Sequence, residues 1–207
     1  MKEEIIELKP IKVLTSEITI VGDSKLILNK MNDRTKRALL DARRGKAVEK
    51  REPNDWEDRM TAIHWRDGQP TDFTEEGMKD ALKNNAPCIN TFGLMKSFKE
   101  AVVRNEIDKF STKFGASVNI VEDYIPVTFA KCELGEMLIS PKKGAPVRSL
   151  LTYFDGWSAT FTIRYIEGGV YSLEQIINII NLAGFGLGIG SGRINSGYGR
   201  YHVGSVK

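Results

Sequence analysis

The sequence predicts an α+β protein with a ferredoxin-like (RRM-like) βαββαβ fold: an antiparallel sheet, two helices on one of its faces, and a long basic insertion after the first strand. Residues 157–166 alternate apolar and polar side chains, as a half-buried strand does. Residues 92–108 and 172–183 instead repeat apolar side chains at helical spacing. With strands expected at 11–21, 116–139 and 199–206, the chain reads strand, helix, strand, strand, helix, strand.

Composition limits the classes of function. The chain has 207 residues and 41% hydrophobic residues, enough for a sizeable core, and we expect a single domain over 1–207. The net charge is only +3, so any nucleic-acid contact must come from local clustering. Cys88 and Cys132 have no metal-ligand neighbours, and we expect no metal and no cofactor. No apolar run is long enough to cross a membrane, and we expect a cytoplasmic protein.

The first strand leads into an unusual insertion. Residues 4–14 and 17–21 alternate in strand fashion, with Pro10 marking an edge or a break. Residues 23–90 then form an inserted, thumb-like segment, and its stretch 46–55 is polar enough to be mobile in the free protein. Between 34 and 51 lie eight basic and two acidic residues. This imbalance favours nucleic-acid contact, the alternative being a solvated helix face. The candidate contacts are Arg34, Lys36, Arg37, Arg43, Arg44 and Lys46.

Shorter elements are expected inside the insertion. A helix is predicted to start near Leu26, and another to be capped by Asn54 or Asp55. Residues 74–84 predict a third helix with Thr74 as its cap, and His64 is expected in the core or an interface.

The helix predicted at 92–108 has a second possible role. Leu94, Phe98 and Val102 fall on one apolar face. The free N–H groups of its first turn, near Thr91, favour a phosphate, with Lys96, Ser97 and Lys99 beside them. The alternative is a plain amphipathic core helix.

The remaining elements complete the fold. Strands are expected at 116–120, 125–132 and 135–139, followed by a loop at 141–146. Ser172 and Gln175 form a capping box that starts the last helix, and Gly184 is expected to end it.

A run of seven glycines lies between Gly184 and Gly199. Glycine suits positive φ angles and close backbone approach, and arginines inside the run add charge, so the pattern predicts a phosphate-backbone site. The alternative is a flexible surface loop. The candidate residues are Gly188, Gly190, Ser191, Gly192, Arg193, Gly197, Tyr198, Gly199 and Arg200.

Two of these motifs resemble a known family. Residues 190–200 resemble the C-terminal glycine-rich loop of the RAMP superfamily, which supplies RNA-binding backbone and processing subunits to CRISPR systems, and Asn90–Ala101 resembles its first-helix motif. The insertion resembles the thumb of the backbone subunits. Residues 55–203 are also similar to uncharacterised tailed-phage proteins, which implies a host-cytoplasmic setting. The resemblance implies a ferredoxin-like fold and nucleic-acid binding.

Three functions follow from this sequence. The first is a non-catalytic module for single-stranded nucleic acid, RNA in preference to DNA, working as a homo-oligomer or filament along the strand. The second is a phage interaction protein that mimics or inhibits a CRISPR effector complex. The third is a metal-independent endoribonuclease, for which His202, just after the glycine run, is the candidate acid or base.

Overall fold

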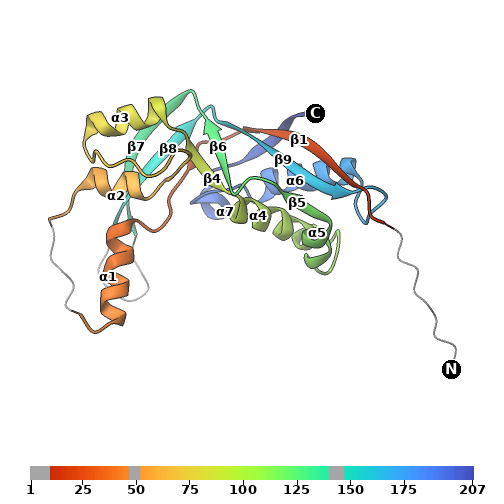
Figure 1. The fold of residues 1–207 in the computed structure, drawn as a ribbon, viewed down its shortest axis with the longest axis horizontal. Helices are drawn as coiled ribbons and strands as arrows, with labels where there is room; N and C mark the ends of the chain where they lie inside the picture. The colour runs from red at the N-terminus through yellow and green to blue at the C-terminus, as the bar shows by residue number, and fades with distance from the viewer. Residues whose placement is uncertain (1–9, 47–51, 140–146) are drawn as a thin grey trace.

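The structure is a computed structural model that describes residues 10–46, 52–139 and 147–207. The molecule is elongated (Figure 1), with α4, α5, α6 and β1, β9 toward one end and α1, α2, α3 with β7, β8 toward the other. The prediction of mobility at 46–55 falls in part on residues 47–51, and the strand predicted at 4–14 falls in part on residues 1–9. Both of these parts lie outside the described residues.

The predicted βαββαβ arrangement is confirmed. The strands of the main sheet run in the order β10-β1-β9-β6-β4-β3, with β5 also paired to β9, and every pairing is antiparallel. Apart from the insertion, two short helices and the strands at 131–139 and 147–155, the order along the chain is β1, α4, β5 and β6, β9, α6, β10. The strands are β1 (Val13–Gly22), β3 (His64–Trp65), β4 (Pro87–Asn90), β5 (Val118–Ile120), β6 (Tyr124–Thr128), β9 (Ser158–Ile166) and β10 (Tyr201–Val206).

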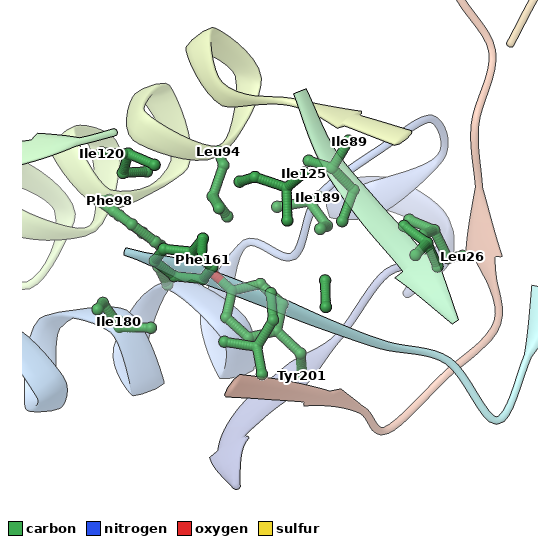
Figure 2. Packing of buried hydrophobic residues seen from close by; sticks show 14 of the residues in the cluster. Leu26, Ile89, Leu94, Phe98, Ile120, Ile125, Phe161, Ile180, Ile189 and Tyr201 are labelled. Carbon is green, nitrogen blue, oxygen red and sulfur yellow. The ribbon is translucent and has the colours of Figure 1, made fainter. Parts of the chain in front are cut away.

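Two helices, α4 (Thr91–Arg104) and α6 (Leu173–Gly186), cover one face of this sheet and close the core. Leu94 and Phe98 from α4, Ile180 from α6 and Phe161 from β9 belong to one buried cluster (Figure 2). The Phe98 and Phe161 ring centroids are 6.2 Å apart. The short helix α5 (Thr112–Ser117) adds Phe114 to this core. Apolar side chains at helical spacing therefore meet the inward side chains of the alternating strand, as predicted.

A second sheet, of three strands, packs with the insertion and includes one of its strands. Its order is β2-β8-β7, and it consists of β2 (Leu26–Ile27), β8 (Val147–Asp155) and β7 (Lys131–Ile139). Arg59 of α2 is buried and donates to the carbonyl oxygens of Gly135 at 2.9 Å and Leu151 at 2.7 Å. This side chain therefore ties the insertion to the β7–β8 hairpin. The insertion helices are α1 (Asp33–Arg43), α2 (Asp55–Thr61) and α3 (Glu75–Asn84).

Local capping follows the sequence closely. Asn54 caps α2, Thr74 caps α3, and Ser172 with Gln175 forms the predicted capping box of α6. The cap of α4 is Asn90, one residue before Thr91, and its side chain accepts from the Phe92 N–H. These caps depend on local hydrogen bonds, which is why sequence predicts them well.

Four element predictions were wrong. The helix expected near Leu26 starts at Asp33, because Leu26 and Ile27 pair with β8 instead. The helix predicted over 92–108 ends at Arg104. Helix α6 continues past Gly184, whose missing Cβ lets the Tyr201 backbone pack against it. Residues 147–155 form a strand that the sequence did not predict, and 135–139 pairs with it rather than joining the main sheet.

Candidate nucleic-acid interface

The glycine loop (residues 187–200, including the short helix α7, Arg193–Ser196) is a packed part of the fold. Gly188, Gly190, Gly192, Gly197 and Gly199 all have positive φ angles between 65° and 76°. A Cβ at Gly199 would overlap the Ile189 carbonyl oxygen, and one at Gly190 would overlap that of Ile27. These two glycines are therefore required for the loop to pass close to itself and to β2.

Two of the loop glycines have no free N–H group to offer a phosphate. Gly188 is buried and donates to the Ala183 carbonyl at 2.8 Å, and Gly199 is buried and donates to Lys25 at 2.8 Å. The backbone N–H of Ser191 bonds to Ile27 at 2.9 Å. Gly190 and Gly192 are exposed, and no acceptor for their N–H groups is found among the described residues.

A pocket of about 310 Å³ lies where the loop meets the first turn of α4. We call it the basic pocket, because its lining contains three cationic side chains and no carboxylate. Lys30 comes from the insertion, Lys96 from α4 and Arg193 from the loop. The lining residues are Leu28, Asn29, Lys30, Ala62, His64, Cys88, Ile89, Asn90, Gly93, Leu94, Lys96, Ile189, Gly190, Ser191 and Arg193.

The start of α4 opens onto this pocket. Asn90 and Gly93 both line it, and no acceptor for the Gly93 N–H group is found within the described part of the chain. Gly93 has open space where a Cβ would stand. The first turn of a helix carries partial positive charge, so the bare backbone at Gly93 adds to the three cations.

Burial inside the pocket changes the acid–base chemistry of two lining groups. Burial lowers the pKa of the Lys30 ammonium. Burial, with the charges of Lys30 and Lys36, lowers the pKa of His64, which stays neutral near pH 7. The Asp33 carboxylate partly opposes the lowering of the Lys30 pKa, whereas only burial and cations act on His64. Burial also raises the pKa of the Cys88 thiol to about 11, so this thiol stays protonated.

Several predicted contacts position the loop instead of lining the pocket. Ser97 is fully buried and donates to the Gly188 carbonyl at 2.9 Å, which leaves it no surface for a ligand. Arg200 donates to the Phe185 carbonyl at 2.7 Å and so caps the end of α6. The Tyr198 ring lies 5.6 Å from that of Tyr153, between ring centroids. The Lys99 stem lies over Gly115, away from the pocket.

The basic helix α1 is a separate feature. It projects from the body (Figure 1) and has no buried residue. Arg34 forms an ion pair with the buried carboxylate of Asp58, through Nε at 3.0 Å and through a second nitrogen. The other candidates are exposed, namely Lys36, Arg37, Arg43, Arg44 and Lys46. None of the α1 candidates lines the basic pocket.

His202 lies outside the pocket as well. It is an exposed residue of β10, and its Nδ1 is 2.6 Å from an Asp23 carboxylate oxygen. The expectation that His202 stands near the anion site is therefore wrong, because β10 follows the loop on the far side of β1 from β9. His64 lines the pocket instead, and only the pairing of β3 with β4 brings it there.

Two further hollows adjoin the basic pocket. One, of about 360 Å³, shares Asn29, Lys30 and Ala62 with it and extends to Arg34 and Arg148. The other, of about 440 Å³, shares Asn90 with it. We call this second one the aromatic hollow, because Phe92 and Tyr124 line it together with Met95. Each of these two hollows therefore shares lining residues with the basic pocket.

Among the described residues, no group of three or more His, Cys, Asp or Glu side chains is placed to hold a metal ion. In that same part of the chain, no helix has the length and apolarity needed to cross a membrane. Both cysteines carry free thiols.

The fold defines an α+β protein with a ferredoxin-like sheet and a cationic pocket beside the start of α4. No protein-family model matches the sequence. No curated protein matches it either. Among solved structures, a chain of the "Cryo-EM structure of the Type III-B Cmr-beta bound to cognate target RNA" is similar, at 12% identity and a TM-score of 0.48. The match covers 95% of this chain and 60% of that one, so this chain spans about 60% of its length.

Proposed function

We propose that the chain binds the phosphate backbone of single-stranded nucleic acid, without cleaving it, in the basic pocket. The observation that carries this proposal is the pocket's lining: Lys30, Lys96 and Arg193 converge there from three separate segments, and no acid accompanies them. Arg193 makes one long 3.4 Å contact with Glu100, which does not line the pocket. Cations that face one hollow repel one another, and a phosphate relieves that repulsion.

The hollows that share lining residues with the basic pocket favour an extended strand over a free anion. A phosphate fits the basic pocket, and Lys30 also lines the adjoining hollow, where Arg34 is paired with Asp58 and Arg148 with Asp55 and Glu136. Proteins that hold single strands combine a cationic groove with aromatic side chains, and the basic pocket and the aromatic hollow together offer both. The open face of the main sheet has a different character, because the aromatic residues of β9, Phe161 and Tyr165, turn toward the helices.

We propose RNA as the ligand in preference to DNA, which is what the sequence resemblance to RAMP proteins implies. On the same resemblance we propose a CRISPR-related or phage setting, with repeated copies of the chain along one strand. In that arrangement residues 23–90 act as the thumb of a single domain and reach toward a neighbour. Light scattering with size exclusion, with and without an RNA oligonucleotide, tests the assembly.

The central experiment is a binding titration with fluorescent single-stranded RNA and DNA over a salt series. Lys96→Ala with Arg193→Ala is expected to weaken binding at least tenfold for every sequence and to lower the salt slope by about 1.4, since each phosphate contact contributes about 0.7 for single strands.

The matched control is Arg104→Ala with Lys109→Ala, which removes the same charge from exposed positions at and beyond the other end of α4. Equal losses in the two double variants would mean that only net charge matters. Absence of binding by the unaltered protein at low salt would overturn the proposal.

Two alternatives are tested in the same assay. His202→Ala is expected to leave affinity unchanged, and EDTA-resistant cleavage of labelled RNA that this variant loses would instead establish a nuclease. Co-purification with a CRISPR effector complex that survives Lys96→Ala with Arg193→Ala would favour an interaction protein.

A further inference from the structure

The aromatic hollow has features that phosphate binding does not explain. Phe92, the second residue of α4, is 78% exposed although it is a large apolar side chain. Tyr124, on β6, is 46% exposed and lines the same hollow. The two exposed rings line one hollow, which distinguishes them from an isolated exposed ring such as that of Phe185.

The position of the hollow suggests what covers these rings. Asn90 lines both the hollow and the basic pocket, and the Tyr124 ring lies 4.8 Å from that of His64, which also lines the pocket. A group bound in the hollow is therefore next to the proposed phosphate site. In a nucleotide, the group attached beside the phosphate, through the sugar, is the base.

We propose that the aromatic hollow seats one nucleobase of the bound strand, stacked against Phe92 and Tyr124. This inference rests on the proposed function and adds a contact with a base to the proposed phosphate contacts. Stacking on aromatic side chains is how proteins commonly hold unpaired bases. Met95 adds a polarizable, adaptable wall.

The polar groups of the hollow indicate which base fits best. Asp123 and Asn119 line it and are exposed, and no partner for the Asp123 carboxylate is found among the described residues. A carboxylate accepts hydrogen bonds, so it favours a base with two adjacent N–H donors on one edge. Guanine has this edge in its N1–H and N2–H groups, and the seat is expected to prefer guanine.

The test compares two short single strands that differ at one position, a guanine or an abasic site. Phe92→Ala is expected to weaken binding of the guanine strand about tenfold, the size of one lost base stack, and to leave binding of the abasic strand unchanged. Phe185→Ala is the control, because Phe185 is 84% exposed and lines neither the hollow nor the basic pocket. It is expected to bind both strands as the unaltered protein does.

The outcomes distinguish base stacking in the aromatic hollow from phosphate binding in the basic pocket. If Phe92→Ala and the unaltered protein bind the guanine strand equally, base stacking in the aromatic hollow is overturned. Phosphate binding in the basic pocket is then still tested separately by the Lys96 and Arg193 variants. Failure of the unaltered protein to bind even the guanine strand removes both. For base choice, replacing guanine with adenine is expected to cost several-fold in affinity, and Asp123→Asn to abolish that difference. Equal affinity of the unaltered protein for the two bases overturns the guanine preference.

Discussion

The glycine loop and helix α1 both carry basic residues in sequence, yet they differ in how the fold holds them. The loop buries Leu187, Ile189 and Gly199 and presents Arg193 to a pocket that other segments complete. Helix α1 buries no residue, and its Leu39 and Leu40 are 51% and 46% exposed. A cluster of basic residues in the sequence therefore indicates an anion-binding site only where packing fixes the positions of the cations.

The largest expected effect compares two glycines with the same φ of 65°, Gly199 in the loop and Gly45 after α1. Gly199→Ala is expected to cost about 3–5 kcal/mol in unfolding free energy, because the new Cβ overlaps the Ile189 carbonyl and the φ is unfavourable. Gly45→Ala has open space and is expected to cost about 1 kcal/mol. Urea denaturation measures both. Equal losses would show that the loop is no more tightly packed than the end of α1.

The second comparison concerns two arginines. Arg34→Ala leaves the buried Asp58 carboxylate without its ion-pair partner and is expected to cost about 1–2 kcal/mol of stability. In the described part of the chain, the one ion pair of Arg193 is a long 3.4 Å contact with Glu100, so Arg193→Ala is expected to cost less than about 0.5 kcal/mol. RNA affinity is expected to fall more in Arg193→Ala than in Arg34→Ala. A stability loss from Arg193→Ala as large as that from Arg34→Ala would contradict this division of roles.

The third comparison uses the exposed cations of α1. Replacing Arg37, Arg43 and Arg44 together with Gln is expected to leave stability within about 0.5 kcal/mol and to reduce RNA affinity only a few-fold at low salt. Titration at two salt concentrations measures the effect. If affinity instead falls as far as in Lys96→Ala with Arg193→Ala, α1 is part of the primary site.

The smallest expected effect is on pH dependence. Because burial lowers the pKa of His64, the folded chain takes up a proton less readily than the unfolded chain, whose histidines titrate near 6.5. The His64 contribution to stability is therefore full above about pH 6.5 and decreases as the pH falls below it. His64→Gln should flatten the stability profile measured by thermal unfolding between pH 5 and 8, and His202→Gln, the other histidine, is its control. An unchanged profile in His64→Gln would show that His64 is not buried against these cations.

The sequence by itself determined the ferredoxin-like order of elements, the caps Asn54, Thr74 and Ser172, and the alternation of β9, because these depend on interactions within a few residues or on simple periodicity.

Only the tertiary structure decided which residues share the site. Lys30 and His64 reach the basic pocket through the pairing of β2 with β8 and of β3 with β4, contacts that no local pattern specifies. Tertiary packing likewise turned Ser97 and Arg200 inward to hold the loop and moved His202 away from the pocket. Residue types and local spacing can be read from the sequence. The convergence of Lys30, Lys96 and Arg193 on one hollow depends instead on long-range strand pairing, which burial of the whole core determines.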